Sequence, residues 1–217
     1  MYLPTQFKQE NLDTLYQLIE QHPFATLIVV VDGVVEVNHV PLELLREPLS
    51  LGVLKGHIAK ANPLAHLLQQ DRDAYLVFHA EQQYISPNGY ASKAIDHRAV
   101  PTWNYRVVHV EGQIKRVDDE KFLRGVLARL TRQHEASQTT PWTMSQAPED
   151  FIRAKLKEIV GIEIQIAQIT GKFKLSQNQS EANARSAATH LEATDPVMAE
   201  LIREHHPSTM QHPKKNA

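Results

Sequence analysis

An alternation of apolar and polar residues runs through the middle of the chain. Val108, Val110 and Ile114 fall on one face of an extended chain, and the polar residues between them fall on the other, as the two-residue repeat of a half-buried strand requires. A cluster of polar and aromatic residues opens this segment. We therefore predict a strand over residues 102–117.

Similar runs elsewhere predict about six antiparallel strands in all. The strongest single signal is Asp32-Gly33 between two β-branched runs, because this dipeptide favours the two-residue turn of a hairpin. The other strands are expected over residues 26–31, 34–37 with a continuation over 42–45, 49–58, 74–78 and 162–175.

Helical spacing and capping residues predict the remaining elements. Asn62-Pro63 is typical of a helix start, because Asn suits the N-cap and Pro the first helical position. Asp118 is expected to cap a helix that begins near Asp119. The expected helices cover residues 12–21, 63–68, 119–130, 151–156 and 180–191, with a last one from residue 195.

Strands and helices do not alternate regularly along the chain. This order favours a β-barrel with attached helices over a doubly wound parallel sheet, so the fold class is mainly β with helices (α+β). A length of 217 residues suits a single domain. We expect one domain over residues 1–206, C-terminal helices included, and a flexible tail over residues 207–217.

The composition excludes several classes of function. The chain has no Cys, which rules out disulfides, thiolate catalysis and Cys-based metal sites. Its 12 His are scattered without the spacing of a metal motif, and we expect no metal. No apolar run has membrane-spanning length and the N-terminus does not resemble a signal peptide. We therefore expect a cytoplasmic protein without membrane contact.

The charge balance does not favour nucleic acid as a partner. A formal net charge of -2 gives no general attraction to a polyanion, and no helix-turn-helix with a basic second helix is visible. Binding of nucleic acid would need a local basic patch or a second protein.

Three groups of residues are candidates for ligand binding. In the first, Lys55 and His57 are two apart on an expected strand and project to the same side. Lys60 follows just before the helix expected at Asn62. Cations beside a helix start suit a phosphate. The spacing fits equally with solvated lysines and an ordinary strand histidine.

The second group lies at the mouth of the 102–117 strand. Thr102 and Asn104 share one strand face and are able to bond the polar edge of a flat ring. Trp103 and Tyr84 are able to wall such a ring. The alternative is an aromatic core plug at a strand end. The preceding segment, residues 86–100, is a long loop of the kind that often carries function.

The third group ends the last strand. If that strand persists far enough, Lys172, Lys174 and Ser176 align on one face. Such a polar edge suits a ligand or a partner subunit, and it also suits a solvated strand end.

Taken together, segments spread over nearly the whole chain resemble one family, the PaiB-type FMN-binding negative transcriptional regulators. The segments that carry the resemblance, in order, are Met1-Tyr2-Leu3-Pro4 with Phe7, His39-Val40-Pro41-Leu42, Gly56-His57-Ile58-Ala59-Lys60-Ala61-Asn62-Pro63, Tyr84-Ile85-Ser86-Pro87, Val100-Pro101-Thr102-Trp103-Asn104-Tyr105, Val108-His109-Val110-Glu111-Gly112 and Lys174-Leu175-Ser176-Gln177-Asn178.

The resemblance implies an FMN-binding split β-barrel, related to the pyridoxamine 5'-phosphate oxidases and flavin reductases. It also implies a homodimer with flavin sites at the interface. The residues that it suggests for FMN are His57, Ala59 and Lys60 at the phosphate, Thr102, Trp103 and Asn104 in the strand-mouth motif, and Lys174, Ser176 and Gln177 in the last segment. Lys55 joins the phosphate group from its strand spacing to His57. One position departs from the family, because Gly89 stands where the family usually has Trp.

The resemblance favours a flavin-binding negative transcriptional regulator. Two alternatives stay open at this point. One is an FMN-dependent oxidoreductase, in which the flavin carries the chemistry, and the other is a cofactor-free dimeric interaction scaffold. No catalytic residue is predicted.

Overall fold

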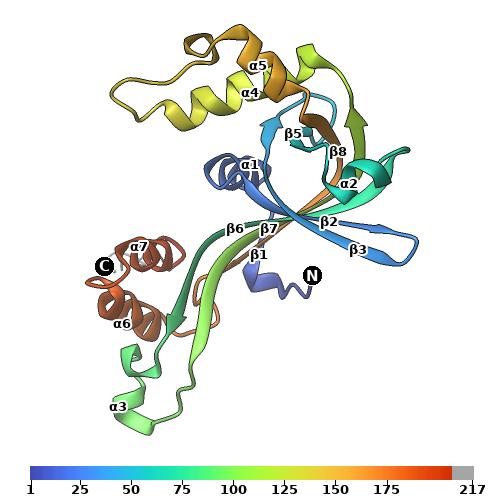
Figure 1. Cartoon of the computed structure of the whole chain (residues 1–217). Coiled ribbons are helices and arrows are strands. Elements are labelled where there is room, and N and C mark those ends of the chain that lie inside the picture. The colour runs from blue at the N-terminus through green and yellow to red at the C-terminus, as the bar shows by residue number, and fades with distance from the viewer. Residues whose placement is uncertain (207–217) are drawn as a thin grey trace. The chain divides into compact units, whose positions relative to one another are not determined.

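The structure is a computed structural model that describes residues 1–206 (Figure 1). The tail expected over residues 207–217 lies outside the described residues. Two compact units are present. Unit 1 comprises residues 1–9, 80–106 and the part of the chain from residue 172, and unit 2 comprises residues 10–79 and 107–171. The expectation of a single domain over residues 1–206 stays a prediction, and the units are described separately below.

Eight strands form one sheet in the order β3-β2-β6-β7-β8-β5-β4, and β1 pairs with β8. The pairings β2–β3, β2–β6, β4–β5 and β5–β8 are antiparallel. The strands are β1 (Lys8–Gln9), β2 (Phe24–Val31), β3 (Val34–Pro41), β4 (Glu43–Leu45), β5 (Val53–Ala59), β6 (Arg72–Ile85), β7 (Thr102–Val117) and β8 (Ile159–Lys174). The predicted α+β class is therefore confirmed.

The expected count of about six strands is too low for two reasons. The two-residue β1 is too short to show a pattern. The stretch expected as one strand with a continuation divides into β3 and β4, because β3 pairs with β2 whereas β4 pairs with β5.

The strand expected over 49–58 begins only at Val53. Gly52 precedes it with a φ of +92°, and a Cβ there would lie 2.6 Å from the carbonyl oxygen of Leu45.

Seven α-helices occur within residues 1–206, none of them long and apolar enough to cross a membrane. They are α1 (Leu12–Gln21), α2 (Pro63–Leu67), α3 (Lys93–Asp96), α4 (Glu120–Glu135), α5 (Glu149–Leu156), α6 (Glu181–Leu191) and α7 (Pro196–Glu204).

The helix starts follow the predicted capping chemistry with one exception. The Asn62 side chain accepts a hydrogen bond from the Leu64 amide at the start of α2, as predicted. The cap of α4 is Asp119, whose carboxylate accepts from the Phe122 amide. The prediction of Asp118 as this cap is wrong, because Asp118 pairs instead with Arg116 at 2.6 Å.

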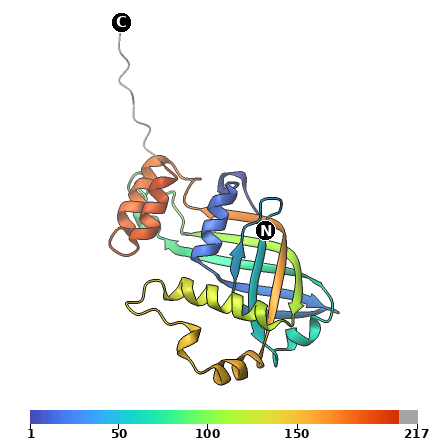
Figure 2. The ribbon, with the colours of Figure 1, turned by 90° about the horizontal axis from the view of Figure 1, so that it is seen from above.

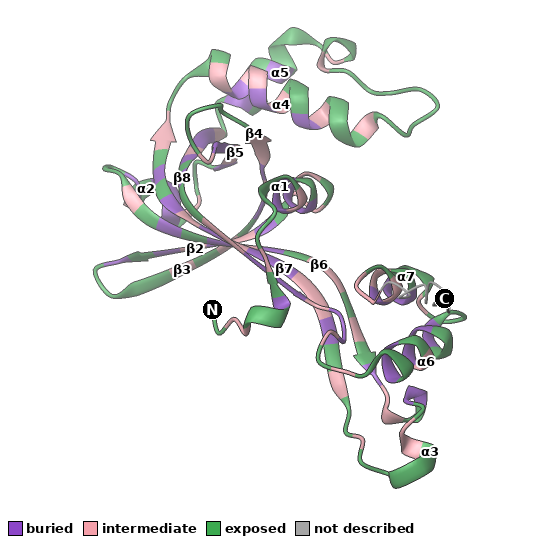
Figure 3. Ribbon diagram, turned by 180° about the vertical axis from the view of Figure 1, so that it is seen from behind, coloured by how far each residue is buried: buried purple, intermediate pink, exposed green. Residues whose placement is uncertain are grey.

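In unit 2, the hairpin of β2 and β3 turns at Asp32 and Gly33, which have φ angles of +51° and +81°. Positive φ angles at both central residues are typical of a type I′ turn, whose twist matches the twist of the two flanking strands. The hairpin prediction is therefore confirmed. The side chains of β2 that face inward, such as Leu27 and Val29, are fully buried, whereas much of β3 is exposed (Figure 3).

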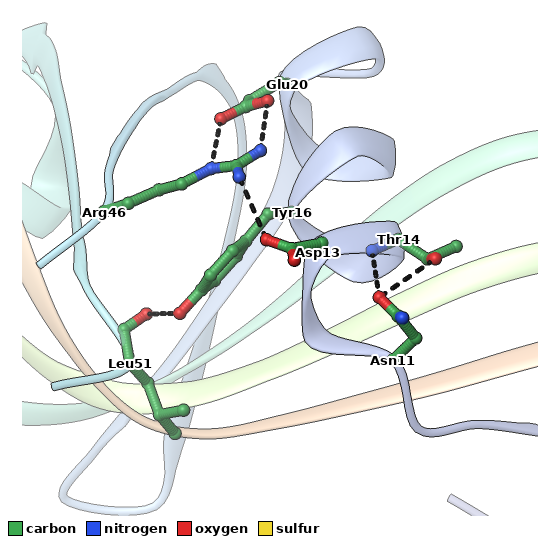
Figure 4. A network of polar contacts seen from close by, with 7 residues as sticks. All are labelled: Asn11, Asp13, Thr14, Tyr16, Glu20, Arg46 and Leu51. Atoms are coloured by element: carbon green, nitrogen blue, oxygen red, sulfur yellow. Dashed lines mark hydrogen bonds and ion pairs between the residues drawn. The ribbon is translucent and has the colours of Figure 1, made fainter. Parts of the chain in front are cut away.

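Helix α1 is held in unit 2 by a polar network with Arg46 at its centre (Figure 4). The Arg46 guanidinium donates to both carboxylate oxygens of Glu20 at 2.8 and 2.7 Å, and it donates to Asp13 at 3.3 Å. The Tyr16 hydroxyl donates to the Leu51 carbonyl at 3.0 Å. These bonds fix the polar side of α1, whose apolar side buries Leu18 and three other residues.

In unit 1, α6 and α7 pack side by side (Figure 2). The loop over residues 86–100 contains a 3-10 turn, Pro87–Gly89, and the short helix α3. Asn183 of α6 anchors this loop, because its amide accepts from the Ser92 backbone amide and donates to the Ser92 hydroxyl, both at 2.9 Å. The loop is therefore ordered by α6.

Candidate functional site

The first candidate group lies in unit 2 on β5. Lys55 faces Glu163 of β8, and its Nζ lies 3.1 Å from the carboxylate. Lys115 also contacts Glu163, at 2.7 Å. Burial raises the pKa of Glu163, but the bonds from Lys115 and Lys55 outweigh it and hold that pKa below its usual value. Lys55 and Lys115 thus share the single negative charge of Glu163, which the sequence did not indicate.

His57 lies two residues along the same strand, opposite Gly161. Its Nδ1 is buried and has no hydrogen-bond partner in the structure. Burial lowers the pKa of His57 below its ordinary value, so the ring is neutral near pH 7. A neutral imidazole with an unpartnered nitrogen suits a hydrogen bond to a ligand, and the assignment of His57 to a phosphate stays a prediction.

Ala59 ends β5, and the exposed Lys60 follows it. Lys60 has no carboxylate within ion-pair distance among the described residues. The pKa of Asp118 is lowered chiefly by its bonds from Arg116 and also by the charge of Lys60. Lys60 lines a cavity of about 170 Å³ together with Lys157 and the acidic residues 118–120. Helix α2 has only five residues, and Asn62 already bonds its first amide, so the helix start adds little to an anion site.

The second and third candidate groups meet in unit 1, at the mouth of β7 and the end of β8. Asn104 is fully buried and its Nδ2 donates to the Ser176 hydroxyl at 2.8 Å. The Lys174 ammonium donates to the Trp103 carbonyl at 2.7 Å and also to the Thr102 hydroxyl. The sequence presented these groups as separate, and the pairing of the two strand ends unites them.

Lys174 is partly buried, and burial lowers its pKa, with a further lowering from the charge of Lys172. Lys172 itself is 9% exposed. Its Nζ donates to the Tyr2 carbonyl at 3.1 Å and lies 5.6 and 5.4 Å from the ring centroids of Tyr2 and Tyr105. Tyr2 and Tyr105 were not among the predicted site residues, because cation–π contacts between distant segments leave no mark in the sequence.

Trp103 and Tyr84 form an edge-to-face pair, with ring centroids 6.0 Å apart and an interplanar angle of 71°. Trp103 is 54% exposed and Tyr84 is 44% exposed. The alternative of a buried aromatic plug is therefore wrong, and the pair presents an aromatic surface beside the Lys174 contacts.

Gln177 has both ends of its amide engaged in a local turn. Its oxygen accepts from the Leu175 amide and its nitrogen donates to the Phe173 carbonyl, both at 2.7 Å. This turn holds Ser176 at a φ of +68°, an uncommon conformation for a residue with a Cβ. Gln177 thus positions Ser176, and a direct contact to a ligand stays a prediction.

Gly89 is buried against α6. A Cβ at this position would lie 3.2 Å from the Cβ of His190 and 3.4 Å from the Cα of Ala187. The large ring that the family usually has here does not fit while α6 keeps this position. The absence of a side chain at Gly89 therefore allows α6 to pack closely against this position.

Comparisons with known proteins show the family of the chain. Residues 1–168, most of the chain, match the family model described as "Putative FMN-binding domain". A relative from Emericella nidulans, uncharacterized protein AN0679, is 30% identical, with 94% of this chain and 97% of the relative covered. Protease synthase and sporulation protein PAI 2 of Bacillus subtilis is 26% identical over the same shares of the two chains.

Solved structures share the fold at low identity. The FAD and heme binding protein from Mycobacterium smegmatis has a TM-score of 0.55 at 17% identity, with 77% of this chain and 73% of that chain covered. The conserved hypothetical protein Rv2991 from Mycobacterium tuberculosis has a TM-score of 0.57 at 12% identity, with 83% and 94% covered. These likenesses confirm the predicted fold, a split β-barrel with helices.

The residues present fit a flavin. The unpartnered atoms His57 Nδ1 and Asn104 Oδ1 are buried, and such atoms call for a bonding partner. Within unit 2, the unpartnered nitrogen of His57 suits a hydrogen bond to a ligand. Within unit 1, Thr102 and Asn104 suit the alternating donors and acceptors of a flavin ring edge. The predicted cofactor class, FMN, and the resemblance to the PaiB-type proteins are confirmed by the family match. The chain belongs to the family of FMN-binding domains.

Proposed function

We propose that the chain is an FMN-binding regulatory protein of the PaiB type that acts negatively on transcription. The observation that carries this proposal is the end-to-end match to the Bacillus subtilis protein, which spans 94% of this chain and 97% of that protein. A DNA contact made by this chain alone would be weak, because its formal net charge is -2.

In unit 2, Lys60 and His57 are our candidates for the FMN phosphate. Within residues 1–206, Lys60 has no carboxylate at ion-pair distance and His57 Nδ1 has no partner. Lys55 contributes to the local potential through its pair with Glu163, and Ala59 leaves the strand end open for close approach. A charge-assisted bond to a phosphate contributes about 1.5–3 kcal/mol.

In unit 1, Thr102, Asn104 and Trp103 are our candidates for the flavin ring. Asn104 Oδ1 lacks a partner, and Trp103 presents an exposed aromatic face. Lys174 fixes Thr102 and the Trp103 carbonyl. The Ser176 hydroxyl holds the Asn104 side chain through a hydrogen bond. Gln177 stabilises the turn that carries Ser176 through its bonds to the backbone of Leu175 and Phe173.

We propose a homodimer, and the outward face of β2 and β3 supports it. Val30 and Val35 are cross-strand neighbours, as are Ile28 and Val37. Val30, Val35 and Val37 are 51–57% exposed. A contiguous apolar sheet face that includes the edge strand β3 is seldom left uncovered. The face carries no charge at these positions, so a second copy meets it without repulsion.

The isoalloxazine ring supplies electron-transfer chemistry when FMN is bound, so an FMN-dependent oxidoreductase is the competing function. One experiment tests both. The protein is purified without added flavin, its absorbance spectrum is recorded, and reduction by NADH and NADPH is followed by stopped flow. A regulator is expected to show a flavin band that is reduced no faster than free FMN. Reduction well above the rate of free FMN contradicts the proposal.

A further inference from the structure

Lys172 and Lys174 of unit 1 are partly or largely buried lysines that have no acid as a partner within residues 1–206. The nearby Arg106 is neutralised, because its guanidinium donates to both carboxylate oxygens of Glu81 at 2.7 Å. Lys172 and Lys174 differ from it. Within residues 1–206, neither ammonium has a carboxylate at ion-pair distance, and every acceptor that each contacts is a neutral oxygen.

The burial of these charges makes an anion their natural counterpart. Lys172 is 9% exposed, and a buried cation is costly unless it is paired. The faces of Tyr2 and Tyr105 and the Tyr2 carbonyl solvate the ammonium without cancelling its charge. The charge of Lys172 adds to burial in lowering the pKa of Lys174, which shows that the two cations act on each other.

The site also has hydrogen-bond capacity to spare. An ammonium has three N–H donors, and Lys174 directs two bonds to Thr102 and Trp103. The unpartnered Asn104 Oδ1 is an acceptor, so it does not bind an anion and stays with the flavin ring. The partial exposure of Lys174 and the 54% exposure of Trp103 leave the site open to small molecules.

The cofactor has a single phosphate, and this argument rests on the proposed function, which gives that phosphate to Lys60 and His57 of unit 2. The single FMN phosphate is then assigned to Lys60 and His57, and Lys172 and Lys174 are left without an anion from the cofactor. We propose that Lys172 and Lys174 bind the carboxylate or phosphate group of a second small molecule, a co-substrate or an effector, in addition to FMN.

The test uses the FMN-loaded full chain. Sodium phosphate and sodium succinate are titrated separately at constant ionic strength, and the midpoint of thermal unfolding is recorded. A ligand that binds only the folded state raises this midpoint in a saturable way. We expect saturation with at least one of the two anions, and the more effective anion identifies the ligand group as phosphate or carboxylate.

Four variants assign that effect. Lys172→Met and Lys174→Met are expected to weaken the anion at least tenfold, and Lys174→Arg is expected to retain it. Lys121→Met removes one exposed charge from α4 and is expected to behave as the wild type. Should Lys172→Met fail to fold, the Lys174 variants alone decide, because Lys174 is less buried.

Two results overturn the proposal. One is an anion effect that does not saturate or that is the same in all variants. The other is a Lys174→Met variant that loses affinity for FMN but not for riboflavin, which places the cofactor's own phosphate at these lysines. Failure of the proposed phosphate site in unit 2 is seen separately, as an unchanged FMN affinity of Lys60→Ala.

Discussion

The side chains of Asn104 and Ser176 are joined by a hydrogen bond of 2.8 Å, although the two residues are 72 positions apart in the chain. Both are buried, at 0% and 1% exposure. The bond ties the mouth of β7 to the turn after β8, where Ser176 has a φ of +68°. It therefore links the two segments of unit 1 that carry the candidate ring-binding residues.

Replacing Ser176 by Ala removes this bond and leaves the Asn104 amide without its partner. The Cβ and the positive φ are the same in Ser and Ala, so the bond alone changes. We expect a loss of about 1–3 kcal/mol in the free energy of unfolding, measured by urea denaturation. Ser145→Ala, at an exposed position, is the control and is expected to change it by less than about 0.5 kcal/mol. Equal stability of Ser176→Ala and the wild type contradicts this expectation.

Replacing Lys60 by Ala tests the phosphate assignment. Loss of one charge-assisted bond of about 1.5–3 kcal/mol lowers the affinity for FMN roughly tenfold or more. Riboflavin lacks the phosphate, so its affinity is expected to change little. Lys157→Ala, in the same cavity, is the matched control, and quenching of flavin fluorescence gives both affinities. Equal losses for FMN and riboflavin indicate that Lys60 acts through folding.

The parts of the fold that the sequence predicts are those with a local cause. The Asp32-Gly33 turn and the Asn62 cap depend on residues within a few positions, and both are found as predicted. The strand expected over 74–78 extends to Arg72–Ile85. Its polar second half does not follow a strand pattern, and it is set by pairing within the sheet. Adjacent Asp118 and Asp119 are equally suited to cap α4, and the contact of Arg116 with Asp118 decides between them.

The candidate site was predictable in its residue types and unpredictable in its contacts. The strand spacing pointed to Lys55, but the register that sets Lys55 opposite Glu163 comes from the β5–β8 pairing, and this register decides that Lys55 forms an ion pair. Lys174 and Thr102 were assigned to separate groups for the same reason. Strand register between distant segments is fixed by tertiary packing, which one sequence does not reveal.

The pH dependence of stability tests the environment of His57. Burial holds the pKa of His57 in the folded chain below the ordinary value of 6.5, so the unfolded chain binds more protons between these two pKa values. The contribution of His57 to the free energy of unfolding is therefore fully present above pH 6.5, and it is lost as the pH falls through the pKa of the folded chain. We expect His57→Gln to lose less stability than the wild type between pH 7 and pH 5. Urea denaturation across this range measures the difference, and parallel curves contradict the burial of His57.

The β3 edge offers a matched pair of substitutions for the dimer. Val35 lies beside Val30 on the outward apolar face, whereas Val34 lies beside Val31, whose side chain is buried. Both Val34 and Val35 are 57% exposed. Val35→Lys puts a charge into the face that a second copy is proposed to cover, and the desolvation of that charge opposes association. We expect Val35→Lys to be a monomer in sedimentation at micromolar concentration, and Val34→Lys to remain a dimer. A wild-type monomer, or two variants that associate equally, places the dimer interface elsewhere or removes it.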